Sequence, residues 1–386
     1  MSNTSTNSKP KPNWYPPWAP RFWNGMRLGD YLRLMKENRF KIHPLRYPMF
    51  ALGGGCALMN SILAQVQDVT HGSVIESAQL KKPPVFIIGH WRSGTTLMHE
   101  LMSMDSRLAF PTNFDAFIPN HFLASRFFFY PFLKLLMPRQ RPMDNMSMGV
   151  GSPQEDDFAL CAYGAPTPYR RIAFPNQPSR EHLNLKLSAA DHEVQEQLHG
   201  AMDYFLKALT VRYDSQLVLK SPPHTGRLEQ LAEWFPGAKF VHMARHPHKL
   251  VPSTMRLWKL LDSLQGFQIP RYDDTWLKNY IFECKDLMYS AYFNQRDSIP
   301  KNQLVEVNFE NLTSQPIAEM ERVYDQLEMD GFGELQPSLV EYFERKKNHK
   351  KNPFTLESSL ELEIDNNWHR YMDVFGYSSS SERSSV

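Results

Sequence analysis

Short apolar runs alternate with longer segments of helical periodicity from about residue 82 onward. The runs are VFII at 85–88, QLVLK at 216–220, AKFVHMA at 238–244 and QLVEVNF at 303–309. Segments with apolar residues at helical spacing follow them, around 225–235, 248–262 and 315–328. Apolar runs of about four to eight residues are typical of strands buried on both faces of a parallel sheet. The alternation therefore predicts an α/β domain with a central parallel sheet flanked by helices.

Two further helices are predicted before this domain, at 28–41 and 49–68. We expect them to form an N-terminal helical extension, residues 28–81, that packs on the core. The most apolar window of the chain, 49–66, carries three consecutive glycines and Asn60, so it falls short of the roughly 20 apolar residues of a membrane span. This favours a packed helix of a soluble protein over a membrane-spanning helix.

The two ends of the chain have the composition of tails. Residues 1–27 begin with a polar, proline-containing stretch and are expected to form a flexible tail, but their aromatic part, 14–26, is too apolar to remain in water. We expect those rings to be buried along the domain surface, with a membrane-interface belt as the alternative. The serine-rich residues 377–386 are predicted to be disordered, so the main domain covers 82–376.

Charge and cysteine content narrow the classes of function. The 386 residues include 43 Lys or Arg and 41 Asp or Glu, a formal net charge of +2, so nothing predicts binding to a nucleic acid. Cys56, Cys161 and Cys284 are odd in number and far apart, which favours a reducing compartment over a disulfide framework. The polar N-terminus does not resemble a secretory signal, and we expect a cytoplasmic protein without a metal site.

The stretch GHWRSGTT, residues 89–96, follows the first predicted strand and has the frame of a phosphate-binding loop. Gly89 and Gly94 would allow the close backbone approach that such a loop needs, and the N-terminus of the next helix adds positive partial charge. The lysine of nucleotide hydrolases and kinases is replaced by Thr95, and a later apolar run is followed by Arg245 instead of an acidic residue. A nucleotide kinase with a degenerate loop is therefore the less favoured alternative. We expect a P-loop-type anion site without Mg²⁺, formed by Arg92, Ser93, Gly94, Thr95 and Thr96.

Three segments of the domain carry a family resemblance. They are PPVFIIGHWRSGTTLMHELM (83–102), LKSPPHTGRLEQLAEWFPGAKFVHMARHPHKLVPSTM (219–255) and VEVNFENLTSQP (305–316). Together they resemble sulfotransferases that use 3′-phosphoadenosine 5′-phosphosulfate (PAPS), and the arginine-bearing loop is similar to that of the tyrosylprotein sulfotransferases and a related bacterial group. The resemblance covers about 82–330 and implies a nucleotide-binding core, PAPS as co-substrate without a metal, and transfer of the sulfuryl group to a hydroxyl or amine. It also implies that Arg245 and Ser253 bind the 3′-phosphate.

Sulfuryl transfer needs cations beside the leaving oxygen and a base beside the acceptor. Arg92 and Lys220 are the candidate cations, because both follow or end predicted strands, where ligands gather in such folds. In the tyrosylprotein enzymes the base is a glutamate downstream of the loop arginine, and the corresponding position here is Asn113. Asp115, two residues away, and Glu155, in a later loop, are therefore equal candidates for the base.

Other charged residues admit two interpretations. Asp156 and Asp157 follow Glu155 and equally fit the first turn of a helix, and His121 ranks behind the two candidate bases. The basic run at 345–351 is interpreted as a solvated helix end, with a place near the 3′-phosphate as the alternative. Five histidines near the motifs are interpreted as polar lining rather than metal ligands: His90, His99, His242, His246 and His248.

The sequence leaves open whether the acceptor is a small molecule, glycan, lipid or peptide, and it does not indicate an oligomeric state. The aromatic segment SRFFFYPFLKLLMP, 125–138, could line an acceptor site or touch a membrane, but core packing is the favoured interpretation. A catalytically silent nucleotide-binding protein of the same fold is a further alternative, which the presence of Arg92 and Lys220 disfavours.

Overall fold

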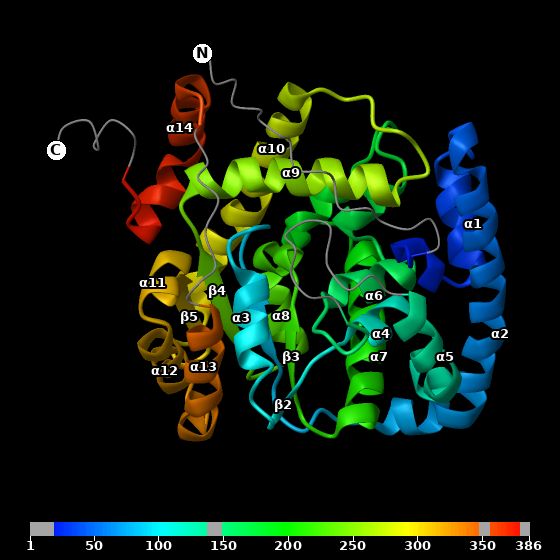
Figure 1. The fold of residues 1–386 in the computed structure, drawn as a ribbon, viewed down its shortest axis with the longest axis horizontal. Helices are drawn as coiled ribbons and strands as arrows, with labels where there is room; N and C mark the ends of the chain where they lie inside the picture. The colour runs from blue at the N-terminus through cyan, green and yellow to red at the C-terminus, as the bar shows by residue number, and fades with distance from the viewer. Residues whose placement is uncertain (1–18, 137–148, 347–355, 379–386) are drawn as a thin grey trace, which may run out of the picture.

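A sheet of five parallel strands, in the order β2-β3-β1-β4-β5, lies at the centre of the molecule (Figure 1). The strands are β1 (Val85–Ile88), β2 (Leu108–Ala109), β3 (Gln216–Lys220), β4 (Lys239–Ala244) and β5 (Leu304–Asn308). The computed structural model describes residues 19–136, 149–346 and 356–378. Most of the basic run at 345–351 and of the tail at 377–386 therefore lies outside the described residues. The predicted α/β class with a central parallel sheet is confirmed.

Helices surround this sheet. In chain order they are α1 (Leu28–Glu37), α2 (Tyr47–Ser77), α3 (Thr95–Met102), α4 (Asn113–Phe117), α5 (Phe122–Leu136), α6 (Asp156–Ala162), α7 (His192–Tyr213), α8 (Leu228–Trp234), α9 (Pro247–Gln265), α10 (Asp274–Gln295), α11 (Phe309–Ser314), α12 (Pro316–Gln326), α13 (Phe332–Lys346) and α14 (Ser358–Phe375). Short 3-10 helices include η1 (Phe22–Gly25), η3 (Pro168–Ala173) and η6 (Pro222–Arg227). The predicted helices at 248–262 and 315–328 correspond to α9 and α12, and the one at 225–235 is divided between η6 and α8.

The central strand β1 explains why the apolar runs form this sheet. All four of its side chains are buried, and successive side chains of a strand point to opposite faces. Val85 and Ile87 pack in one apolar cluster with residues of α3, α12 and α13, whereas Phe86 and Ile88 pack in another with residues of α8, α9 and α10. A strand covered by helices on both sides needs an apolar side chain at every position, which is the pattern that predicted it.

The aromatic segment before α1 is packed against the domain. Phe22 and Trp23 are 4% and 0% exposed, and Trp23 Nε1 donates a hydrogen bond to the carbonyl oxygen of Gln265 at 2.7 Å. The expected burial of the aromatic rings is confirmed for these two residues. The expected flexible tail is wrong for residues 19–27, because burying large rings removes that stretch from solvent. Residues 1–18 lie outside the described part of the chain.

Helices α1, α2 and α5 lie together at one edge of the molecule (right in Figure 1). Helix α2 is longer than predicted and packs on α1, α5 and α7 by one face only, since 22% of its most apolar 18-residue window is buried. Its length and composition would suffice to cross a membrane. The expected core packing of 125–138 is wrong for much of α5, because Phe127, Phe128 and Leu135 are 83%, 74% and 82% exposed.

Candidate active site

The phosphate-binding loop, residues 89–94, connects β1 to α3. Both of its glycines have positive φ angles, 134° at Gly89 and 109° at Gly94. A Cβ at Gly89 would lie 2.4 Å from the carbonyl oxygen of Met243, and a Cβ at Gly94 would lie 2.4 Å from the ring of Phe309. Only glycine therefore allows the loop to lie this close to β4 and α11.

The loop and the start of α3 present polar groups to one place. Helix α3 begins at Thr95, so its unpaired N–H groups and its positive dipole end face the loop. Ser93 and Thr95 are buried, and the Ser93 hydroxyl has no hydrogen-bond partner among the described residues. Buried hydroxyls are ordinarily paired, so an orphaned one at a loop of this kind indicates a ligand site. Thr96, in the first turn of α3, is half-buried beside it.

Three residues from separate segments meet at the ends of β1 and β4. Arg92 has a φ of 69°, and its Nε donates to the hydroxyl oxygen of Ser253, on α9, at 3.0 Å. Arg245, which follows β4, donates from Nη1 to the carbonyl oxygen of Arg92 at 3.0 Å. The two candidate residues for the 3′-phosphate and the loop arginine thus form one cluster.

The Arg245 side chain is positioned by protein groups but keeps an unused donor. Its guanidinium carbon lies 4.4 Å from the centre of the Phe309 ring, and its backbone N–H donates to the Tyr371 hydroxyl at 3.0 Å. Its Nε is buried and has no partner among the described residues. Burial, and then the nearby charge of Arg92, lower the pKa of Arg245. Two neighbouring guanidinium groups, with the Arg245 Nε–H not hydrogen-bonded to any described residue, form a favourable binding site for an anion.

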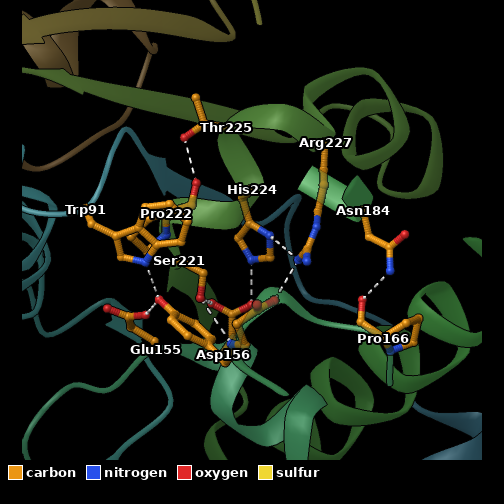
Figure 2. A network of polar contacts seen from close by, with 12 residues as sticks. Trp91, Glu155, Asp156, Pro166, Asn184, Ser221, Pro222, His224, Thr225 and Arg227 are labelled. Atoms are coloured by element: carbon orange, nitrogen blue, oxygen red, sulfur yellow. Dashed lines mark hydrogen bonds and ion pairs between the residues drawn. The ribbon is translucent and has the colours of Figure 1, made fainter. Parts of the chain in front are cut away.

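Lys220 and Glu155 form an ion pair at the end of β3. Lys220 Nζ lies 2.6 Å from Glu155 Oε1, and the two side chains are 3% and 12% exposed. The Tyr169 hydroxyl donates to Glu155 Oε2 at 2.5 Å, and Trp91 Nε1, from the loop, donates to the Tyr169 oxygen at 2.9 Å. Burial, followed by the negative charge of Glu155, raises the pKa of Tyr169 well above its ordinary value, so this phenol keeps its proton. These contacts connect the candidate base to the phosphate loop, and Trp91 and Glu155 lie on the same side of the network in Figure 2.

The other two acids of the cluster form the first turn of α6, which was one of the two interpretations of the sequence. Asp156 lies 2.6 Å from His224 Nε2 and Asp157 lies 2.6 Å from Arg227 Nη1, with all four side chains fully buried (Figure 2). Burial is the largest single influence and would raise the pKa of Asp156, but the charge of His224 and the hydrogen bonds from His224 and Ser221 together hold that pKa below its ordinary value. Both carboxylates therefore anchor α6 to η6, which leaves Glu155 as the acid of the cluster beside Lys220.

Helix η6 also supports the phosphate loop. The Thr225 hydroxyl oxygen accepts from the Gly89 N–H at 2.7 Å and donates to the Pro222 carbonyl oxygen at 2.8 Å (Figure 2). A Cβ at Gly226 would lie 1.7 Å from the carbonyl oxygen of Leu185, so glycine is required there as well. The segment LKSPPHTGR thus holds the loop on one side and the acidic cluster on the other.

Asp115 lies in a structural network instead of facing the loop. It is fully buried, forms a capping box with Thr112 at the start of α4, accepts from the Tyr213 hydroxyl at 2.9 Å and pairs with Arg212. Asn113, at the position expected for the family's base, donates to a backbone carbonyl at 2.7 Å. The surroundings of Asp115 occupy its carboxylate, so the structure supports a capping role for it and not proton transfer.

Four of the histidines singled out from the sequence are buried and held neutral. Burial is the main cause that lowers the pKa of His90 to about 4, of His99 to about 3 and of His242 to about 3. His121 hydrogen-bonds to side chains on α2 and α5, and burial lowers its pKa to about 4. In the three described ranges, no group of three His, Cys, Asp or Glu is placed to hold a metal ion.

Some residues around the site were not singled out from the sequence. Tyr169 positions Glu155, and Phe309 packs on both Gly94 and Arg245. A single aromatic residue gives no motif, because its role depends on which distant segment it meets. The partners of Asp156 and Asp157 could have been sought in the sequence. Two acids inside a protein need basic partners, and LKSPPHTGR contains His224 and Arg227.

Comparison with known proteins decides the family. A model of the sulfotransferase family matches residues 83–334, close to the predicted core at about 82–330. The chain is also 33% identical over 360 residues to the omega-hydroxy-beta-dihydromenaquinone-9 sulfotransferase Stf3 of Mycobacterium bovis and of Mycobacterium tuberculosis, covering 93% of this chain and 92% of that protein. The chain belongs to the sulfotransferase family.

Solved structures show the same fold as this sulfotransferase. Sulfotransferase STF9 from Mycobacterium avium superposes with a TM-score of 0.69 at 16% identity, covering 95% of this chain and 93% of that one. STF1 from Mycobacterium tuberculosis gives a TM-score of 0.60 at 15% identity, covering 88% and 90%. The family resemblance carried by the three sequence segments is confirmed, and the protein is an enzyme that transfers a sulfuryl group, which enzymes of this family generally take from PAPS.

Proposed function

We propose that this sulfotransferase binds PAPS, as a substrate, across the ends of β1 and β4. The phosphate loop and the N-terminus of α3 would hold the 5′-phosphosulfate, and Arg245 and Ser253 would hold the 3′-phosphate. PAPS carries negative charge at two separate positions, and both proposed anchors have cationic or N–H donors facing outward. The unpartnered Ser93 hydroxyl in one anchor and the unpartnered Arg245 Nε in the other carry this assignment.

We propose that Glu155 is the general base. The acceptor oxygen would attack sulfur while the bond from sulfur to the 5′-phosphate oxygen breaks, and the acceptor's proton would pass to the Glu155 carboxylate. Arg92 and Lys220 would stabilise the negative charge that forms on the departing phosphate oxygen. The products are the sulfated acceptor and 3′,5′-ADP. The 2.6 Å contact between Lys220 and Glu155 supports this assignment, because it puts a candidate cation and a candidate base at one place.

We propose a lipophilic acceptor that bears a hydroxyl group. The relatives at 33% identity are named for omega-hydroxy-beta-dihydromenaquinone-9, and the match extends over nearly all of both chains. Rings also gather beside the proposed base: Phe158 and Trp91 lie 4.9 and 6.3 Å from the Tyr169 ring, centre to centre. Such a wall favours an apolar acceptor over a glycan or a charged peptide.

We further propose that the enzyme works in the cytoplasm. All three cysteines are free, which suits a reducing compartment. Burial raises the pKa of Cys161 and of Cys284 to about 12, so their thiols stay protonated and inert.

Calorimetric titration tests the donor site. We expect 3′,5′-ADP to bind without Mg²⁺ and more tightly than ATP with Mg²⁺. Arg245→Ala should weaken 3′,5′-ADP at least about tenfold more than 5′-AMP, because a charged hydrogen bond to the 3′-phosphate is lost only in the first ligand. Lys249→Ala, at an exposed position on α9, is the matched control. Equal losses for both nucleotides would refute the role of Arg245, and a preference for ATP with Mg²⁺ would favour the kinase alternative.

A further inference from the structure

The arrangement of apolar and polar side chains on α2 is the reverse of that expected for a surface helix of a soluble protein. Apart from Ile75 near its C-terminal end, its buried positions carry small or polar side chains, namely Gly53, Ala57, Asn60, Ala64 and Gln67. Six of its large apolar side chains point outward and are 38–87% exposed: Leu52, Leu58, Met59, Ile62, Val66 and Val69. A surface helix ordinarily buries its apolar stripe and exposes its polar one. The outward face of α2 therefore matches an apolar environment.

The orientation of α2 is fixed by hydrogen bonds from its buried amides. Asn60 Nδ2 donates to the carbonyl oxygens of Asn24 and Met26 at 2.7 and 3.0 Å. Gln67 Oε1 accepts from the N–H of Leu123 at 2.9 Å. Placing α2 across a membrane would remove it from the domain and leave these amides unpaired. The helix therefore lies along the protein, with one long face outward.

Helix α5 extends this apolar surface. It packs beside α2 at the same edge of the molecule (Figure 1). Four of its apolar side chains, spaced to share one side of the helix, are 53–83% exposed: Phe127, Phe128, Phe132 and Leu135. We call the exposed apolar residues of the two helices the α2–α5 face. A continuous apolar surface over two helices is unusual on a protein that meets only water.

The charges around this face identify what it contacts. Residues 47–67 contain no charged side chain, and α5 carries two cations, Arg126 and Lys134, and no acid. Both cations are exposed. The acids of α2 lie further along the helix, where Asp68 pairs with Arg27 and Glu76 is near the C-terminal end. In a two-fold dimer through residues 47–67 and α5, each copy would bring cations and no acid from these segments to meet them. Anionic lipid headgroups supply both the negative charge and the apolar layer beneath it.

We propose that the α2–α5 face docks on the surface of an anionic lipid bilayer. Helix α2 lies in the plane of the interface, its apolar side chains enter the acyl boundary, and Arg126 and Lys134 lie at the level of the headgroups. The inference rests on the exposed side chains alone and does not depend on the donor or the acceptor of the enzyme.

Vesicle flotation of the full chain tests the proposal. One set of vesicles is phosphatidylcholine alone and the other contains about a third phosphatidylglycerol. A triple variant, Ile62→Ser with Val69→Ser and Phe128→Ser, changes the face at side chains 57%, 87% and 74% exposed. The matched control is Val340→Ser with Leu362→Ser, at exposed apolar positions on α13 and α14, away from the α2–α5 edge (Figure 1). Circular dichroism and thermal melting establish that each variant is folded.

The wild-type chain and the control should float with anionic vesicles and more weakly with neutral ones. The triple variant should partition at least about tenfold less, because three apolar side chains no longer enter the bilayer. Arg126→Ser with Lys134→Ser should lose the preference for anionic vesicles. The proposal is overturned if the wild-type chain stays unbound with both vesicle types or if the triple variant floats as well as the wild type. It is also overturned if sedimentation finds a dimer that the triple variant abolishes, since a second copy would then cover the face.

Discussion

At the scale of single residues, a carboxylate acts as a base only where its other contacts leave it turned toward the substrate. Asp156 and Asp157 each form an ion pair with a buried partner, and Asp115 caps a helix and pairs with an arginine. Glu155 also has a cationic partner, Lys220, and accepts from the Tyr169 hydroxyl, but it makes no capping hydrogen bond. Its side chain is 12% exposed, whereas the side chains of the other three acids are fully buried. Adjacent acids in one short sequence thus have different chemistry because they meet different neighbours.

Replacing the proposed base should separate chemistry from donor binding. Glu155→Gln keeps the shape of the side chain and its contact with the Tyr169 hydroxyl, but the amide cannot take up a proton. We expect kcat to fall by about 10²–10⁴ while the affinity for 3′,5′-ADP changes little. Transfer of radiolabelled sulfate and nucleotide titration measure the two quantities.

Two companion variants make this result specific. Glu193→Gln, at an exposed position on α7, should behave as wild type. Asp115→Asn should lower the melting temperature without lowering kcat of the folded enzyme, because it weakens a buried cap and ion pair. Full activity in Glu155→Gln, or a selective loss of kcat in Asp115→Asn, would assign the base elsewhere.

The sequence indicated candidate phosphate-binding residues more specifically than a candidate base. The loop GHWRSGTT is a local pattern, so Arg92 could be proposed from it, and the match of ARHPHKLVPS to the family implied Arg245 and Ser253. The base depends on long-range contacts between α6, β3 and η3, which no local pattern encodes. Asp115 and Glu155 could be separated only once their partners were known.

At the scale of elements, the buried strands were predictable and the N-terminal segment was not. Strands covered on both faces read as continuous apolar runs, and β1, β3, β4 and β5 were found where those runs lie. The two-residue strand β2 is too short to give a pattern. Helix η1 is an irregular, proline-flanked aromatic stretch, and its position follows from the rings it buries rather than from periodicity. The expected packing of α2 and α5 was also wrong. Composition does not indicate which side of an apolar helix faces the core.

Helix η1 should contribute substantially to stability. Trp23 is fully buried and hydrogen-bonded to the backbone of α9, so Trp23→Ala removes a large ring and leaves the Gln265 carbonyl without that donor. We expect the free energy of unfolding to fall by about 3–5 kcal/mol. Urea denaturation measures it, with Leu362→Ala, at a side chain 60% exposed, as the control that should change it little. A loss below about 1 kcal/mol at Trp23 would mean that this segment is not part of the cooperative core.

At the scale of the whole molecule, buried neutral histidines make stability depend on pH. The pKa values of His90, His99 and His242 are lowered to about 4, 3 and 3 by burial, from an ordinary value near 6.5. As the pH falls through 6.5, the unfolded chain takes up protons that the folded chain does not. Stability is therefore lost from about pH 6.5 downward until the folded pKa values are reached.

One of these histidines provides a test of that slope. His242 is stacked between Tyr292 and Phe375, at ring distances of 4.4 and 4.9 Å, so His242→Phe fits the site without a titrating group. Between about pH 4.5 and 5.5, the free energy of unfolding should fall by about 1.4 kcal/mol less per pH unit in His242→Phe than in the wild type. The reason is that unfolding of the variant takes up one proton fewer. Urea unfolding across this pH range measures the slope, with the exposed His192→Phe as the control. An unchanged slope in His242→Phe would show that His242 already takes up its proton in the folded state.

The order of the strands also divides the site into two halves, which the contacts from Trp91 through Tyr169 to Glu155 connect. Arg92, Arg245 and Ser253 lie on the side where β1 meets β4, whereas Lys220 and Glu155 lie where β1 meets β3. The segments that follow β2 and precede β3 include α4 to α7, and these four helices contribute no residue to the cluster of Arg92, Arg245 and Ser253. Evolution can therefore remodel these segments for a new acceptor while the donor half keeps its sequence. This is one physical route by which a single scaffold can diversify into enzymes that share a sulfuryl donor and differ in what they sulfate.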